Sequence, residues 1–92
     1  MSKDLRIIYS YDAEADLLAL EKHIARRIVL KIEANASLAN PLMRAKALTG
    51  ILAGRYRYRI GDYRVIFTLD DGGRVCILKV LRVKHRKDVY RM

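Results

Sequence analysis

Residues 55–69 read RYRYRIGDYRVIFTL, and this stretch decides the fold. Arginine and tyrosine alternate up to Ile60, Gly61-Asp62 interrupt the pattern, and a β-prone run follows. A strand places alternate side chains on opposite faces. Glycine in the first position of a two-residue connection supplies the positive φ of a primed hairpin turn. The stretch therefore predicts an antiparallel hairpin that turns at Gly61-Asp62.

The predicted hairpin gathers arginines on one of its faces. With a two-residue turn, Arg59 opposes Arg64 across the hairpin, and Arg57 lies two residues before Arg59. Opposed residues share one side of a sheet, so these three side chains are expected to converge. Like charges destabilise such a cluster unless an anion lies among them, although long arginine stems also splay easily into water. The spacing favours an anion site.

The flanking sequence predicts the remaining elements. Residues 75–83 are apolar on both faces, which predicts a central strand covered on both sides. Residues 5–9 are β-prone and are expected at an edge of the same sheet. Between residues 12 and 36 apolar side chains recur at helical spacing, as one helix or as two with a bend near residues 21–23. Residues 42–52 suit a short helical turn.

Together these elements predict a single domain, residues 1–92, of the α+β class. A three-stranded antiparallel meander forms one small sheet, with the helical layer packed on one face. Ser10 or Asp12 is expected to cap the helical segment. The apolar stripe of that segment consists of Leu17, Leu20, Ile24, Ile28 and Ile32.

Positive charge is concentrated in the C-terminal part of the chain. There are 19 Lys and Arg against 10 Asp and Glu, a formal charge of +9. Residues 1–54 hold 8 basic and 6 acidic side chains, a net of +2, and residues 55–92 hold 11 and 4, a net of +7. Such an excess attracts polyanions. Tyrosines interleaved with arginines suit phosphate contact combined with base stacking.

Composition excludes several classes of protein. An apolar content of 52% excludes a disordered basic tail. The single Cys76 excludes an internal disulfide and a cysteine zinc finger, and it is expected in the core. No apolar run has the length of a membrane span or of a signal peptide, so a cytoplasmic protein without membrane contact is expected. No carboxylates cluster among the basic residues, and we expect neither a metal nor another cofactor.

The C-terminal segment adds a second group of cations. Arg82, Lys84, Arg86 and Lys87 lie at or beyond the end of the predicted central strand, with His85 and Tyr90 among them. A lone histidine near a strand end is more often a surface residue than a catalyst. The basic region contains no second histidine, which argues against a two-histidine ribonuclease.

Two motifs carry a family resemblance. Gly54 with the run YRYRIGDYRVIF at 56–67, and the ending VKHRKDVY at 83–90, resemble the RelE family of toxin–antitoxin toxins. The resemblance covers nearly the whole chain and implies that the helical segment is a hairpin of two antiparallel helices. It also implies a ribosome-dependent mRNA endonuclease, an mRNA interferase that inhibits translation. The implied partners are mRNA, the ribosomal A site and a cognate antitoxin, which holds the toxin in a hetero-oligomeric complex.

The same resemblance implies roles for individual residues. Arg64 matches the arginine that stabilises the reacting phosphate, Arg86 a basic residue near the leaving oxygen, and Tyr90 a tyrosine that packs on the substrate. Arginine cannot readily act as a base, so Arg59 is doubtful in that role and His85 is the better proton-transfer candidate. The expected catalytic set is Arg64, Arg86, His85, Tyr90 and Arg59. The expected RNA-binding set is Arg55, Arg57, Arg82, Lys84 and Lys87.

Two other functions stay open. A related toxin of the same fold, ParE, inhibits DNA gyrase by binding and cuts nothing. A basic RNA-binding or ribosome-binding module without activity is the third reading. Arg64 and Arg86 favour the nuclease, because a protein that only binds does not need a converged set of phosphate-binding arginines.

Overall fold

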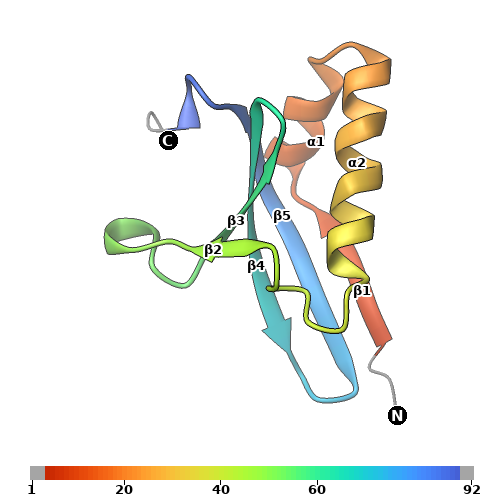
Figure 1. Cartoon of the computed structure of the whole chain (residues 1–92), viewed down its shortest axis with the longest axis vertical. Helices are drawn as coiled ribbons and strands as arrows, with labels where there is room; N and C mark the ends of the chain where they lie inside the picture. Colours follow the sequence, from red (N-terminus) through yellow and green to blue (C-terminus); the bar gives the residue numbers. More distant parts are fainter. Residues whose placement is uncertain (1–3, 90–92) are drawn as a thin grey trace.

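Five strands form one sheet, and two helices cover one of its faces (Figure 1). The computed structural model describes residues 4–89. The strand order is β1-β5-β4-β3-β2, with β1 parallel to β5 and every other pair antiparallel. The α+β class and the edge position of the first strand are confirmed. The elements are β1 (Asp4–Tyr9), α1 (Tyr11–Leu18), α2 (Lys22–Ala36), β2 (Ala45–Ala47), a 3₁₀ turn (Gly50–Leu52), β3 (Tyr56–Ile60), β4 (Tyr63–Asp71) and β5 (Val75–His85).

The β3–β4 hairpin has the predicted register. Gly61 adopts a φ of +58°, the conformation that an L side chain rarely tolerates and that this two-residue turn needs. Arg59 is paired with Arg64. The register that the local sequence predicts for this hairpin is therefore confirmed.

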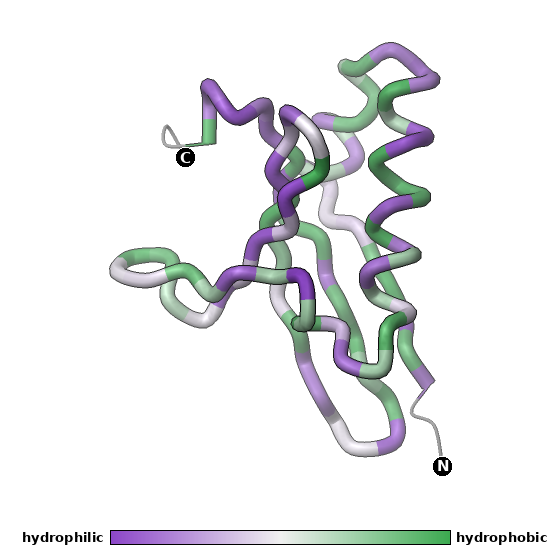
Figure 2. The backbone as a smooth tube through the Cα atoms, viewed as in Figure 1, coloured by the Kyte–Doolittle hydropathy of each residue, from purple (hydrophilic) through white to green (hydrophobic). Residues whose placement is uncertain are grey.

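The helical segment forms two helices, as the resemblance implies. The Ser10 hydroxyl accepts a hydrogen bond from the Ala13 N–H at 3.0 Å and caps α1. Figure 2 shows hydrophobic and hydrophilic positions alternating along α2, as expected of a helix that packs one side on a sheet. Within residues 4–89 no helix is both long and apolar enough to cross a membrane.

The core lies between the helices and the sheet. Its fully buried side chains include Ile28, Ile32, Tyr58, Val65, Phe67, Leu78 and Val80. The rings of Tyr58 and Phe67 are 4.3 Å apart, and the Tyr58 hydroxyl donates to the Pro41 carbonyl at 2.6 Å. Burial raises the pKa of Tyr58 to about 12. Tyr58 belongs to the core, so this tyrosine is not available for the base stacking that the interleaved arginines and tyrosines suggest.

β5 occupies the predicted central position, but only one of its faces is covered. A β-bulge interrupts its register with β4 between Ile66 and Phe67. Val80 and Val83 both become buried as a result. The other face of β5 carries half-buried Ile77 and exposed Lys79, because both helices lie on the opposite side. The prediction of cover on both sides is therefore wrong.

Residues 42–52 form more than the predicted helical turn. The turn is confirmed over Gly50–Leu52, but Ala45–Ala47 form β2, which pairs with β3. Without β2 the outer backbone groups of β3 would lack strand partners, and sheets commonly cover such edges with a short strand. This pairing depends on β3 rather than on any local pattern in residues 45–47.

Candidate active site

Cationic side chains form two rows across the open face of the sheet. In the first row Arg59, Arg64 and Lys84 are directly opposed on β3, β4 and β5. The next row contains Lys46, Arg57, Ile66 and Arg82. Opposed residues in a sheet have Cβ atoms roughly 4.5–5.5 Å apart. We call Lys46, Arg57, Arg59, Arg64, Arg82 and Lys84 together the cationic face.

The middle of the second row is shielded from water. Ile66 lies between Arg57 and Arg82 and is 2% exposed, although no helix covers this face. The Nε of Arg57 is also buried, and it has no hydrogen-bond partner among residues 4–89. An unsatisfied buried donor costs about 1–3 kcal/mol. A ligand oxygen that reaches this nitrogen would remove that cost.

Arg64 is held in place by the turn that precedes it. Its Nη1 donates to the carbonyls of Gly61 at 2.9 Å and Tyr63 at 3.0 Å. Burial, and after it the positive charges of three neighbouring arginines, lower the pKa of the Arg64 guanidinium below its usual value. The three arginines are Arg59, Arg57 and Arg86. The turn therefore fixes one guanidinium amid positive charge that Asp62 only partly compensates, which suits an anion.

Arg86 reaches the same turn from the end of β5. Its N–H donates to the Asp62 carbonyl at 2.7 Å, and its Nε lies 3.7 Å from the Asp62 carboxylate. Both side chains are more than half exposed, so the ion pair itself contributes little to stability. The backbone hydrogen bond is the firmer link, and it keeps Arg86 close to Arg64.

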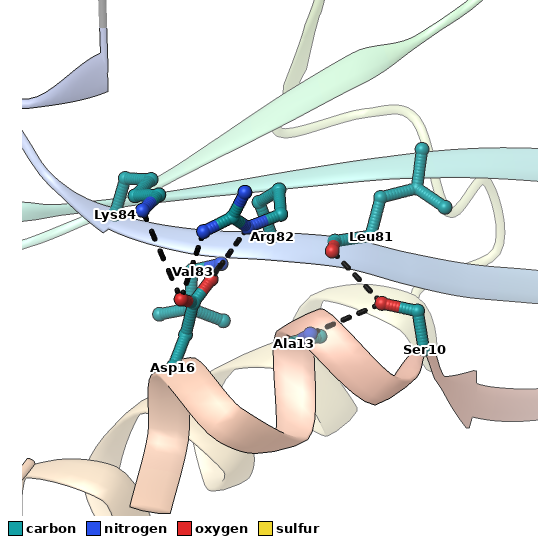
Figure 3. A network of polar contacts seen from close by, with 7 residues as sticks. All are labelled: Ser10, Ala13, Asp16, Leu81, Arg82, Val83 and Lys84. Carbon is teal, nitrogen blue, oxygen red and sulfur yellow. Dashed lines mark hydrogen bonds and ion pairs between the residues drawn. The ribbon is translucent and has the colours of Figure 1, made fainter. Parts of the chain in front are cut away.

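Arg82 and Lys84 are engaged by Asp16 of α1 (Figure 3). The carboxylate accepts two hydrogen bonds from Arg82, at 2.9 and 3.1 Å, and one from the Val83 N–H at 2.9 Å. The Lys84 Nζ is 3.9 Å away. Burial opposes ionisation of Asp16, but the hydrogen bonds and these positive charges outweigh it and lower its pKa. The hydrogen bonds between Arg82 and Asp16 also raise the pKa of the Arg82 guanidinium above its usual value.

The contact of Asp16 with β5 could not be predicted from the sequence, in which Asp16 is simply a favourable negative charge near the start of a helix. β1 ends at Tyr9, so the part of β5 beyond Val80 has no neighbouring strand on that side. Side chains from α1 and its N-cap take the place of a strand: the Ser10 hydroxyl donates to the Leu81 carbonyl, and the Asp16 carboxylate accepts from the Val83 N–H. Nothing in the local pattern signals a contact between residues 66 positions apart.

His85 lies on the other face of the sheet. Lys84 opposes Arg64, whereas His85 opposes Tyr63, and their rings meet edge to face with centroids 5.4 Å apart. The His85 Nδ1 accepts a hydrogen bond from the Lys87 N–H at 3.2 Å. The strand therefore does not bring the His85 ring to the cationic face.

Two further predicted site residues lie at the margins of the cationic face. Arg55 is half-buried just before β3, and Lys87 is exposed beyond the end of β5. Tyr90 lies outside the described residues. Within residues 4–89 no three His, Cys, Asp or Glu side chains come together as potential metal ligands.

Comparison with known proteins places the chain in a family. Residues 7–90 match the family described as the ParE toxin of the type II toxin–antitoxin system parDE. Toxin RelG of Mycobacterium tuberculosis is 41% identical over 51 residues. That match covers 55% of this chain and 56% of RelG, so it spans about half of either protein.

Solved structures share the whole fold. A chain of the toxin–antitoxin complex RelBE2 from Mycobacterium tuberculosis is 30% identical with a TM-score of 0.78, over 96% of this chain and 98% of that one. A chain of the RelB–RelE antitoxin–toxin complex from Methanococcus jannaschii is 28% identical with a TM-score of 0.63, over 91% and 95%. The resemblance drawn from the two motifs is thereby confirmed at the level of the superfamily. The chain belongs to the ParE toxin family, within the RelE/ParE superfamily of type II toxin–antitoxin toxins.

Proposed function

We propose that this toxin is an endoribonuclease that cleaves mRNA on the ribosome and thereby stops translation. The observation that carries the proposal is the Arg64 guanidinium, which two backbone carbonyls hold among Arg57, Arg59 and Arg86. The similarity to RelG and to chains of RelE-containing complexes supports it. A toxin that acted by binding alone would not require one guanidinium to be fixed amid so much positive charge.

The chemistry needs no group other than RNA and positioned cations to stabilise its transition state. The 2′-oxygen attacks the adjacent phosphorus, so an O2′–P bond forms while the P–O5′ bond breaks. The proton of the 2′-hydroxyl passes to a base, and the 5′-oxygen takes up a proton. The products are a 2′,3′-cyclic phosphate and a free 5′-hydroxyl. Negative charge grows on the phosphoryl oxygens, where prearranged donors lower the barrier most.

The geometry suggests distinct roles for the basic side chains on and around the cationic face. Arg64 and the unpartnered Nε of Arg57 would hold the non-bridging oxygens, with Arg59 beside them. Arg86, tied to the turn, would stabilise the leaving oxygen. Flanking phosphates would contact Arg82, Lys84, Arg55 and Lys87, and Tyr90 would pack on the substrate.

His85 provides a prediction about proton transfer. We expect His85→Gln to lower the single-turnover cleavage rate by less than about tenfold, because the ring lies on the Tyr63 side of the sheet. A general acid or base typically contributes about 10²- to 10⁴-fold. Rates for both proteins should be measured between pH 6 and 9. A loss of 100-fold together with a flattened pH profile would instead assign proton transfer to His85.

The proposed reaction is tested by its products. Purified toxin is added to translating ribosomes on a reporter mRNA, and the new RNA ends are mapped and chemically typed. We expect cuts inside ribosome-occupied codons, with 2′,3′-cyclic phosphate and 5′-hydroxyl ends, and no cuts in the same mRNA without ribosomes. Intact mRNA on ribosomes that the toxin demonstrably binds would overturn the proposal.

The proposal includes a cognate antitoxin that neutralises the toxin. The related structures are of toxin–antitoxin complexes. A net charge of +7 over residues 55–92 suits an acidic, partly disordered segment that orders along the toxin. The complex would be hetero-oligomeric, and the toxin would act in the cytoplasm, where its mRNA and ribosomes are.

Gyrase inhibition is the second candidate. Its support is specific, since the family matched over residues 7–90 is that of ParE. A supercoiling assay with purified gyrase separates the two functions. Inhibition of supercoiling without new RNA ends would establish the ParE-like activity and exclude the nuclease.

A further inference from the structure

A cationic hollow of about 570 Å³ lies between α2 and the β3–β4 turn, apart from the open face of the sheet. It opens on the helix-covered side of the sheet, and we call it the helix-side pocket. Its basic lining comes from Arg27 and Lys31 of α2, from Arg44 and from Arg59. Asp62 is the only acid among the lining residues within 4–89, and it already pairs with Arg86. Three of these four basic side chains are not part of the cationic face.

These three side chains carry uncompensated charge. Among residues 4–89, Arg27, Lys31 and Arg44 form no ion pair and no side-chain hydrogen bond. Arg82 and Lys84, by contrast, are partly neutralised by Asp16. Cations that line one hollow without a counter-ion repel one another, and an anion bound among them removes that cost.

The floor of the pocket is apolar and aromatic. Ile24, Ile28 and Ile60 line it together with Tyr63 and His85, whose rings pack edge to face. A volume of this size falls within the roughly 300–1,000 Å³ of small-molecule sites. An apolar aromatic floor beneath a cationic rim matches a planar base joined to a phosphate. A peptide made only of acidic residues would use the rim alone, because its carboxylates have no ring to fill the floor.

We propose that the helix-side pocket binds a nucleotide of the RNA strand, with its base against Tyr63 and His85. The adjoining phosphates contact Arg27, Lys31 and Arg44. Arg59 belongs both to this pocket and to the cationic face, so one strand that passes round the β3–β4 turn contacts both sites. This inference rests on the proposed function in taking RNA as the ligand.

Paired substitutions on α2 test the pocket. Arg27→Ala/Lys31→Ala removes two lining cations, and Arg26→Ala/Lys22→Ala removes the same charge from the same helix outside the pocket. We expect the first variant to bind a fluorescent ten-nucleotide RNA at least tenfold more weakly and the control less than threefold. The slope of log K against log salt should fall by about 1.4 in the first variant, since each phosphate contact on a single strand contributes about 0.7. Equal losses in both variants would overturn the proposal.

A second measurement tests for the base. Adenosine 5′-monophosphate and ribose 5-phosphate carry the same phosphate, but only the first has a base. We expect adenosine 5′-monophosphate to shift the ring NMR signals of Tyr63 and His85, and ribose 5-phosphate to leave them in place. Equal shifts, or displacement of the ten-nucleotide RNA by an equally charged glutamate peptide at lower concentration, would overturn the assignment. Both assays measure binding without ribosomes. A negative result in them would therefore not contradict ribosomal cleavage, and an absence of cleavage would not contradict nucleotide binding in the pocket.

Discussion

Arg64→Ala will lower the rate of ribosome-dependent mRNA cleavage by about 100- to 1,000-fold while leaving the protein folded. Removing one prearranged donor from the oxygens that gain charge in a transition state has effects of this size. Within the described part of the chain the side chain donates only to the Gly61 and Tyr63 carbonyls at the β3–β4 turn, so its loss costs little stability. Single-turnover cleavage and thermal unfolding, measured on the same preparation, give the two values.

The matched control is Arg74→Ala. Arg74 is an exposed arginine in the β4–β5 connection, at the far end of the sheet from the β3–β4 turn. Its replacement removes the same charge and should change the rate less than threefold. Arg64→Lys should be intermediate, because one ammonium cannot hold two carbonyls and also present a planar fork to phosphate. Equal rates for the two alanine variants would show that net charge, and not a fixed guanidinium, supports the reaction.

The part of this site that could be predicted from sequence is the part that local geometry decides. Gly61 specifies the turn, strand alternation specifies the face, and together they place Arg59 opposite Arg64. No information from elsewhere in the chain is needed for that register. The same alternation places Tyr58 on the packed face, although its position between two arginines suggests a nucleic-acid contact. Where composition and periodicity conflict, periodicity is the better guide, because it follows from the geometry of the strand.

Contacts between distant elements could not be predicted. The bulge opposite Ile66 and Phe67 changes which β5 side chains are buried. No residue type at that position predicts the bulge. The helix-side pocket joins α2, which ends at Ala36, to the turn at Gly61-Asp62. His85 lies between Lys84 and Arg86 in the sequence, whereas the strand turns its ring to the opposite face from Lys84. The bulge and the pocket depend on how the sheet and helices pack, whereas the face of His85 follows from strand alternation alone.

Asp16→Ala will destabilise the protein by about 2–3 kcal/mol, since a hydrogen bond to a charged group contributes about 1.5–3 kcal/mol and partial exposure of Arg82 reduces the total. The Asp16 side chain is 14% exposed and accepts from both the Arg82 side chain and the Val83 N–H. In a domain of this size the loss corresponds to a fall in Tm of roughly 10–15 °C. Glu14→Ala removes an exposed charge from the same helix and should cost less than about 1 kcal/mol. Equal losses of stability in the Asp16 and Glu14 variants would mean that Asp16 contributes only as a negative charge near the start of a helix.

The pH dependence of that loss separates the ionised carboxylate from its packing. The folded protein lowers the pKa of Asp16 below its usual 3.8, so ionisation stabilises the fold above that value and ceases to do so as the pH falls through the folded pKa. Asp16→Asn has a similar shape but does not titrate. The free energies of unfolding of the two proteins should therefore differ by a constant amount above about pH 5 and converge below pH 4. A difference that persists at low pH would mean that the carboxylate stabilises β5 by shape alone. Convergence would show that the ionised Asp16 carboxylate, which is partly buried on α1, stabilises the edge of β5 through its bonds to Arg82 and Val83.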